Sequence, residues 1–475
     1  MLENSSPLRD EMNKIMDSEE IPVSYSWSLE FKIKDTFKGE FDLKEKDLFY
    51  LDDEEKNEKI FKPMKVTNID FKDDFEKGIM REIWATVIVQ MGMWAKCLYP
   101  AKDHISCILR RVALKNTTFD KVEDSEIEEF IYDTIFHTDE GNSLAGVDYT
   151  TVSRTDLDNS YMPVNIHVEL LERSVEKTRK VTVGGFYRNI KPEEAIKSIL
   201  NHATKDLEVE GEKAITTISL VEVNNKEKRD HINIPQGMPL LDVPNYIQNN
   251  CGGVYNADLN CYSVGDKIYV YPIYQTDRFE DEKKTLTVIR VAPNLMPQVE
   301  RTFRLDGDAL FILGLSDALY KEISLAKKLS AGNGVRYADT RKFMNGFVET
   351  KDNKAYAKRK KVNSEFKSDD LKEQDTVYVS NQRISSNPFK ERSKLAVRAG
   401  GTYTFQWQNS KPDLLYPSMP ARVLYDEGGE VKELRGVILG VHTSVALIGK
   451  GMTASNYGTT TVINLFALPY EDKES

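Results

Sequence analysis

The most constraining feature of this chain is its end, where residues 415–468 read as three extended segments separated by turns. The segments are rich in β-branched and aromatic residues and cover Pro420–Tyr425, Glu433–Thr443 and Thr459–Leu468. The run Asp-Glu-Gly-Gly-Glu at 426–430 tolerates the positive φ angles of a tight connection, whereas Ile448–Gly458 indicates a longer tip. The pattern predicts a β-meander with one long hairpin and contains nothing that resembles a catalytic centre.

Length and charge bound the remaining possibilities. A chain of 475 residues is too long for one compact core and should divide into about two to four domains. Its 40% hydrophobic and 30% charged residues are ordinary for a folded, soluble protein. The net charge of −11 argues against a dedicated nucleic-acid binder, which usually carries a basic face.

Two stretches bear on location. The longest apolar window, Ile83–Tyr99, is interrupted by Gln90 and Lys96 and is shorter than the roughly 20 residues of a bilayer-spanning helix. It therefore predicts one or two buried strands and no membrane insertion. The N-terminus lacks a basic region followed by an apolar region, so we expect no secretory signal and synthesis in a cytoplasm.

The four cysteines form two pairs of equal spacing, Cys97 with Cys107 and Cys251 with Cys261. Nine intervening residues suit neither a zinc knuckle nor a redox C-x-x-C motif. Such a spacing can place two thiols opposite each other across a hairpin, but a reducing cytosol favours buried free thiols. The oxidation state of each pair stays open.

The pattern along the chain predicts a mainly β, α+β protein in four parts. Residues 1–21 form a polar arm expected to order only on a partner. Residues 22–115 form a first β-domain with strands at 22–33, 81–93 and 104–114, and an acidic edge and loop at 38–58. Residues 116–275 form a connecting α/β module, and residues 276–475 form a second β-domain.

Within the module the apolar spacing predicts a helix at Ser125–His137 and a strand from Met162 to Leu170. A helix should begin at Pro192, where the acidic pair after the proline suits the positive end of the helix dipole. A second helix should begin no earlier than about residue 242, because of Pro244, and should end at Gly252 and Gly253. The strand 267–271 follows.

In the second β-domain we expect strands at 285–291 and 299–305 and a helix at Ala318–Lys328. The polar tract 349–394 carries the basic cluster Lys358–Lys361 and has too few apolar residues for a core. It reads as a charged insertion, and a solvated loop is favoured over a phosphate-binding patch.

No residue pattern predicts a catalytic, cofactor-binding or metal site, so we expect no enzyme. The histidines are scattered without helical spacing, and His167 and His442 lie inside predicted strands, which favours structural roles. Asp306-Gly-Asp308 lacks the later ligands of a calcium loop and indicates a turn, and Gly449-Lys450-Gly451 lacks the remainder of a phosphate-binding loop.

Several of these segments resemble one family. The run from Leu415 to Tyr425, followed by Leu434–Ser444, is similar to the final barrel of the baseplate or tail hub proteins of contractile-tailed bacteriophages, relatives of the hub portion of type VI secretion spike proteins. Thr182–Arg188 and the segment from Pro239 to Pro272 resemble the module between the two barrels of these hubs. Ser418 departs from the family pattern, which has glycine at this turn.

The resemblance implies a structural virion protein of the tail baseplate, assembled in the bacterial host cytoplasm. It implies two tail-tube-like antiparallel β-barrels per subunit and a homotrimer that forms a pseudo-hexameric ring. Such a ring joins the six-fold tail tube protein to the three-fold central spike protein, with baseplate wedge proteins around it. A receptor- or glycan-binding tail protein is the alternative, and a cell-wall hydrolase is a third possibility.

Overall fold

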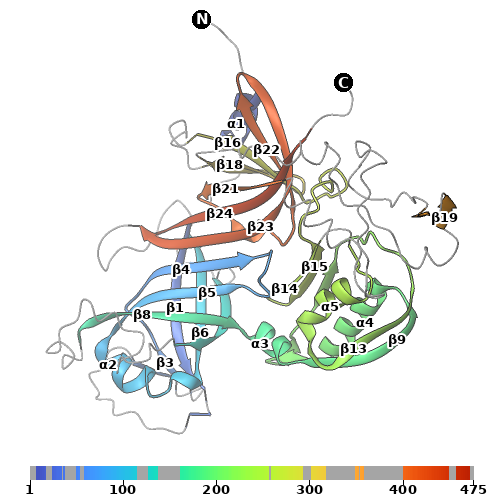
Figure 1. Ribbon diagram of the computed structural model, residues 1–475. Helices are drawn as coiled ribbons and strands as arrows, with labels where there is room; N and C mark the ends of the chain where they lie inside the picture. Colours follow the sequence, from blue (N-terminus) through green and yellow to red (C-terminus); the bar gives the residue numbers. More distant parts are fainter. Residues whose placement is uncertain are drawn as a thin grey trace, which may run out of the picture.

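The computed structural model describes residues 7–17, 24–34, 36–37, 50–53, 58–114, 127–136, 161–255, 258–292, 301–316, 348–351, 354–357, 400–448 and 456–470. These residues form a mainly β protein, as the sequence predicts. A large sheet and a closed barrel share their longest strand, and an α/β module lies beside them (Figure 1).

The second β-domain is a closed six-stranded barrel in the order β16-β18-β21-β24-β23-β22. Its predicted strands at 285–291 and 420–425 are confirmed, but β16 pairs in parallel with both neighbours, so the barrel is mixed rather than wholly antiparallel. Phe405 and Trp407 fill its centre. The strands are β16 (Leu286–Val291), β17 (Phe303–Asp306), β18 (Ala309–Leu315), β21 (Gly401–Gln408), β22 (Pro420–Glu427), β23 (Glu430–Ile448) and β24 (Asn456–Pro469).

The first β-domain is an antiparallel sheet in the order β2-β3-β1-β6-β7-β8-β5-β4. The sheet also includes β7 and β8, which lie after residue 115, where the sequence analysis ends the first β-domain. The domain limits given there stay predictions. The strands are β1 (Ser24–Ile33), β2 (Tyr50–Asp53), β3 (Glu58–Phe61), β4 (Lys65–Asp74), β5 (Glu82–Gln90), β6 (Ile105–Leu114), β7 (Ile127–Ile135) and β8 (Pro163–Glu172).

One strand, β23, belongs to both domains. Its first half pairs with β22 inside the barrel, and its second half, Gly440–Ala446, pairs with β4 of the first sheet. A bulge between Ile438 and Gly440 separates the two halves. The long hairpin β23–β24 crosses from the barrel to the first sheet in Figure 1. The predicted meander with one long hairpin is therefore confirmed, and as far as Ala446 the hairpin pairs with the first sheet of the same chain.

The α/β module contains both helices that the sequence predicts near prolines. α4 (Pro192–Thr204) starts at Pro192, and α5 (Val243–Asn250) follows a short 3-10 turn, η5 (Leu240–Asp242). The other elements are α3 (Arg173–Arg179), β9 (Thr182–Ile190), β10 (Glu208–Val209), β11 (Glu212–Lys213), β12 (Thr217–Leu220), β13 (Arg229–Pro239), β14 (Leu259–Val264) and β15 (Lys267–Pro272).

The predicted helix at Ser125–His137 is wrong, because this segment is strand β7. Ile127, Ile131 and Ile135 are four residues apart, and an even spacing also places side chains on one face of a strand. Tyr132 and Thr134 are buried on the opposite face, which gives the alternation of a strand.

Two further expectations need correction. The arm 1–21 was expected to order only on a partner, but helix α1 (Pro7–Met16) packs on the barrel through Leu8 and Ile15. The window Ile83–Tyr99 was expected to be strand only, but it contains strand β5 and then the helical turns α2 (Met91–Met93) and η1 (Trp94–Leu98).

Some predictions lie outside the described residues. These include the helix Ala318–Lys328, the cluster Lys358–Lys361 and the hairpin tip 449–455. Of the insertion 349–394, the structure describes only the short hairpin of β19 (Val348–Lys351) and β20 (Lys354–Ala357).

Ser418, where the family pattern has glycine, sits in a fully buried corner between the barrel and β15 with a φ of 57°. Its hydroxyl donates to the Pro272 carbonyl at 2.7 Å and accepts from Arg278 Nη2 at 2.7 Å. Arg278 Nη2 also donates to the Ser418 carbonyl at 2.5 Å. The positive φ explains why glycine suits this position, and the hydrogen bonds compensate for the strain of serine.

We expect Ser418→Gly to lower the free energy of unfolding by about 1 kcal/mol, because relief of the strained φ offsets part of the lost hydrogen bonds. Ser418→Ala keeps the strain and loses the same bonds, so it should cost about 2 kcal/mol. Urea denaturation of the two variants checks this order, and an alanine variant as stable as the glycine variant would contradict it.

The hairpin's contact with the first sheet gives a second test. Tyr457 Oη donates to the Val66 carbonyl at 2.8 Å, and the side chain is 7% exposed. Tyr457→Phe should therefore lower the free energy of unfolding by about 1 kcal/mol. Tyr470→Phe, on a tyrosine that is 45% exposed, is the control and should leave the denaturation midpoint unchanged.

Candidate functional site: a polar sheet face shared by both β-domains

One continuous sheet face crosses both β-domains. The strands β21-β24-β23-β4-β5-β8 are hydrogen-bonded in this order, so outward side chains on neighbouring strands stand side by side. One row runs through the cross-strand pairs Gln408–Thr460, Thr460–Ser444, Ser444–Asp70, Asp70–Trp84 and Trp84–Glu169. The first three strands of this row belong to the barrel and the last three to the first sheet.

Most outward residues on this face are polar. On β21 the outward positions are Thr402, Thr404, Gln406 and Gln408, and each alternates with a buried residue. The same alternation holds on β5 and β8, where Thr86 and His167 face outward between buried neighbours. The face is thus a solvated side of a sheet whose other side forms the core.

Hydrogen bonds between side chains tie the strands of this face together. Thr404 Oγ1 donates to Asn464 Oδ1 at 2.9 Å, and Ser444 Oγ donates to Asn68 Oδ1 at 3.2 Å. Thr86 Oγ1 and His167 Nδ1 lie 3.0 Å apart. His442 Nε2 lies 3.4 Å from an Asp70 carboxylate oxygen, and an ion pair links Lys72 with Glu82 at 3.1 Å, so side-chain contacts join β23 to β4 and β4 to β5.

The opposite side of the same strands supplies two hydrophobic cores. Val441 and Ile463 pack in the barrel core, whereas Val445 and Tyr457, further along the hairpin, pack in the core of the first sheet. The barrel and the first sheet therefore share strand β23 and cannot separate without breaking its pairing with β4 or with its barrel neighbours β22 and β24.

A buried ion pair fixes the module to this body. Arg81 donates to Asp73 through Nε at 2.9 Å and Nη2 at 3.1 Å, and Tyr262 Oη donates to the same carboxylate at 2.7 Å. Asp73 is 5% exposed. Burial, together with the Asp73 carboxylate, raises the pKa of Tyr262 well above its ordinary value. The phenol therefore stays protonated and keeps donating to Asp73.

The β4–β5 turn inserts next to this pair. Tyr271 Oη donates to the Phe75 carbonyl at 2.8 Å, and Asn260 Nδ2 donates to the Gly78 carbonyl at 2.8 Å. The Ser263 amide donates to the Ile79 carbonyl at 2.8 Å. Residues of β14 and β15 thus bind the turn as if it were a further strand of the module.

Glu172, at the end of β8, makes the third contact between sheet and module. Its Oε2 accepts the backbone amide of Gly265 at 2.5 Å. Burial raises the pKa of Glu172, and the nearby Asp73 and Asp266 carboxylates raise it further. The Arg81 charge and the hydrogen bond from the Gly265 amide lower this pKa, but the net shift is upward. The junction holds two carboxylates, Asp73 and Glu172, near one guanidinium.

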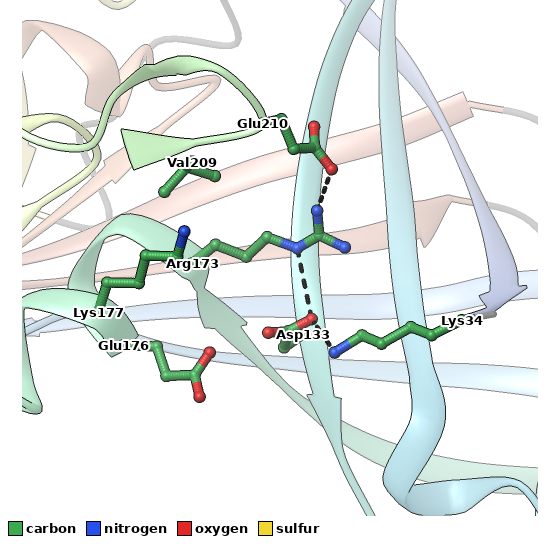
Figure 2. A pocket seen from close by; sticks show the side chains of 7 residues that line it. All are labelled: Lys34, Asp133, Arg173, Glu176, Lys177, Val209 and Glu210. Carbon is green, nitrogen blue, oxygen red and sulfur yellow. Dashed lines mark hydrogen bonds and ion pairs between the residues drawn. The ribbon is translucent and has the colours of Figure 1, made fainter. Parts of the chain in front are cut away.

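A pocket with a volume of about 300 Å³ lies between the first sheet, α3 and the β10–β11 turn. Its lining side chains are drawn in Figure 2. Arg173 reaches Asp133 at 3.3 Å on one side and Glu210 on the other, and Lys34 lies 2.7 Å from Asp133. Burial would raise the pKa of Asp133, but the hydrogen bond from Lys34 and the nearby Arg173 charge lower it. The charged groups of Lys34, Asp133, Arg173 and Glu210 therefore pair with one another, and these ion pairs connect the first sheet to α3 and the β10–β11 turn.

The residues that the sequence singled out are not brought together. His167 and His442 lie in strands, as predicted, and each has the partner described above. All four cysteines are free thiols, three of them buried, and burial raises the pKa of the half-buried Cys251 to about 11. Asp306-Gly-Asp308 forms the predicted turn, between β17 and β18, with Gly307 at a φ of 61°.

Sequence reasoning did not find Asp73, Tyr262 or Glu172. The only signal in the sequence is the alternation of inward and outward side chains along a strand. It places a charged or phenolic residue at an inward position, where an apolar residue is usual. Among the described residues, no group of three or more histidine, cysteine, aspartate or glutamate side chains is placed to hold a metal ion. No helix in the described part of the chain is long and apolar enough to span a membrane.

Comparison with known proteins gives structural likeness only. No protein-family model matches the chain, and no curated protein sequence matches it. Solved structures similar to this chain include phage tail and secretion-spike proteins. The tail protein from Neisseria meningitidis MC58 is 12% identical, with a TM-score of 0.39, and the match covers 93% of this chain and 96% of that chain.

Two other structures have similar scores. The 43 kDa tail protein of prophage MuSo2 from Shewanella oneidensis is 10% identical, with a TM-score of 0.41, over 93% of this chain and 98% of that chain. The E. coli c3393 protein, a component of the type VI secretion system, is 10% identical, with a TM-score of 0.35, over 86% of this chain and 74% of that chain. With these TM-scores below 0.5, support for a function must come from the chain's own residues.

The junction predicts a pH dependence. Because the folded-state pKa of Glu172 lies above its ordinary value of 4.5, its effect on stability is most favourable at low pH and is lost as pH rises through the folded pKa. Glu172→Gln keeps an acceptor for Gly265 without the charge. The free energy of unfolding of this variant, relative to the unaltered protein, should therefore rise between pH 4.5 and pH 7.5.

Urea denaturation across this pH range measures the difference directly. Glu169→Gln removes one negative charge from the same strand and serves as the control. A difference between Glu172→Gln and the unaltered protein that stays constant with pH would contradict the expected role of Glu172.

Proposed function

We propose that this chain is a structural tail protein, a baseplate hub that trimerises into a pseudo-hexameric ring and joins a six-fold tail tube to a three-fold central spike. The observation that carries the proposal is the continuous polar face through both β-domains. The family resemblance of residues 415–444 and 182–188 agrees with it.

The face suits the inner wall of a ring. Its outward hydroxyl and amide groups remain hydrated, while the opposite side of every strand is anchored in a core. Strand pairing joins the two β-domains into one wall, so each subunit contributes two β-lobes, the barrel and the first sheet, in a fixed relative position. Three such subunits present six lobes, which is the match needed between six-fold and three-fold partners.

The dimensions are compatible with a channel. Neighbouring strands lie about 4.8 Å apart, so the six strands of the face span about 29 Å. Three copies placed edge to edge would give a circumference of about 86 Å and a backbone diameter of about 27 Å. The wall would carry mixed and mostly uncharged polar groups, which bind a passing polymer weakly.

In this proposal the partners are a second and third copy of the chain, the tail tube and spike proteins at the two ends of the ring, and baseplate wedge proteins outside it. The protein would act in the virion, after assembly in the host cytoplasm, without catalysis. The junction of Asp73, Arg81 and Tyr262 would then keep the module at a fixed angle on each lobe.

The purified protein should have a mass of three 54.3 kDa chains in multi-angle light scattering, alone or after addition of its spike protein. Negative-stain images of the trimer should show six lobes around a central opening. A chain that stays monomeric with and without tube and spike proteins would contradict the proposal, and turbidity loss on purified peptidoglycan would favour a cell-wall hydrolase instead.

A further inference from the structure

Two neighbouring strands of the barrel are apolar on both faces. β16 and β18 are buried along almost their whole length, whereas β21 alternates between buried and exposed residues. Inward residues such as Val288 and Ile312 fill the barrel core. The residues between them face outward and are buried as well, so a second layer must cover the outside of the barrel here.

The outward residues form one apolar patch across three neighbouring strands. In the parallel register, Ile289 of β16 lies beside Leu313 of β18 and Leu424 of β22. Ile289 and Leu313 are fully buried. These side chains and their neighbours are here called the outer patch, which consists of Ile289, Val291, Phe311, Leu313, Leu315 and Leu424.

Helix α1 covers the outer patch as one helix docks on another protein. Leu8, Met12 and Ile15 stand at positions i, i+4 and i+7, and all three pack against the patch. Arg9 and Asn13, on the other side of the helix, are exposed. The helix contacts β16, β17, β18 and β22 and lies at the top of Figure 1.

A cation beside the patch favours an acidic helix. Arg304 of β17 stands opposite Phe311, with its Cζ 4.4 Å from the ring centre, and its Nη1 lies 3.1 Å from Asp306. Both partners belong to the barrel, so the guanidinium is positioned independently of α1. Its Nη2 lies 3.7 Å from Oε2 of Glu11, at position i+3 counted from Leu8. The barrel is therefore complementary to an amphipathic helix with an acidic residue at this position.

The attachment of α1 is limited. A helix of 10 residues is too short to be stable alone in water, so α1 depends on its contact with the barrel. Its anchors are three apolar side chains and the ion pair of Glu11. Among the described residues, no backbone hydrogen bond joins α1 to a barrel strand. The helix can therefore leave the outer patch without breaking any strand pairing of the barrel.

We propose that α1 is a releasable lid on a helix-binding site of the barrel, and that an amphipathic helix of a partner protein replaces it on the outer patch. The partner helix carries apolar residues at i, i+4 and i+7 and an acidic residue at i+3, as α1 does. The inference does not depend on the proposed ring, because every contact behind it lies within one chain.

The test uses a fluorescent synthetic peptide of residues 7–17 and the full chain with Leu8→Asp/Ile15→Asp. Two aspartates cannot remain in an apolar contact, so this variant releases its own α1 and leaves the barrel residues unaltered. Fluorescence anisotropy should show that the peptide binds the variant at least about 10-fold more tightly than the unaltered protein, whose own α1 occupies the site. Thermal unfolding verifies that the variant is folded.

Arg9→Asp/Asn13→Asp is the matched control, because it also introduces two aspartates into α1, but at exposed positions. It should bind the peptide as weakly as the unaltered protein does. A peptide that does not bind Leu8→Asp/Ile15→Asp, or that binds all three proteins equally, would overturn the helix-binding site.

A changed peptide tests the acidic position. A peptide with Glu11→Lys places a cation beside Arg304, so its dissociation constant for Leu8→Asp/Ile15→Asp should be on the order of 5-fold higher. Equal affinity of the two peptides would overturn the selection for an acidic helix.

A second measurement needs no substitution in the protein. If α1 is a lid, a peptide that captures the open state should speed hydrogen exchange of the α1 amides by the factor 1 + [peptide]/Kd. At a peptide concentration of ten times Kd, the rate for residues 11–16 of the unaltered protein should rise about 10-fold, while β18 remains protected. Exchange of these α1 amides that is unaffected by the peptide would overturn the lid, even if Leu8→Asp/Ile15→Asp failed to fold.

Discussion

The structure depends on the pairing of β23 with β4. This pairing turns a closed barrel and an adjoining sheet into one hydrogen-bonded body, because a single strand completes the barrel with its first half and extends the sheet with its second. The two hydrophobic cores are correspondingly joined through the inward residues of one hairpin. Without it, two small β-domains would be connected only by loops and would move independently.

The second constraint is polar and lies at the junction with the module. Asp73 and Arg81 are both on the β4–β5 hairpin, yet their partner Tyr262 is in the module. A buried pair of this kind adds little net stability but is costly to break from one side, so it specifies one geometry. Stability of the body and orientation of the module thus have different physical origins.

Strand periodicity in the sequence predicted the mainly β fold, the C-terminal meander and both proline-initiated helices. It failed at residues 127–135, where a spacing of four residues fits a helix and a strand equally, and only the pairing with β6 decides between them. It also left β21 unassigned, although Gly401–Gln408 alternates perfectly between buried and exposed. The junction residues were not predictable, because Asp73 and Tyr262 are 189 positions apart and no local pattern records that they meet.

The bulge in β23 has a geometric consequence for assembly. An extra residue between Ile438 and Gly440 bends the strand where it passes from barrel to sheet, and Gly440 leaves room there for the backbone of Asp73, whose carbonyl oxygen would lie 3.0 Å from an added Cβ. The bend sets the angle between the two lobes of a subunit. In the proposed ring that angle would fix the curvature of the wall, so this one-residue irregularity would govern how wide a tube the protein could fit.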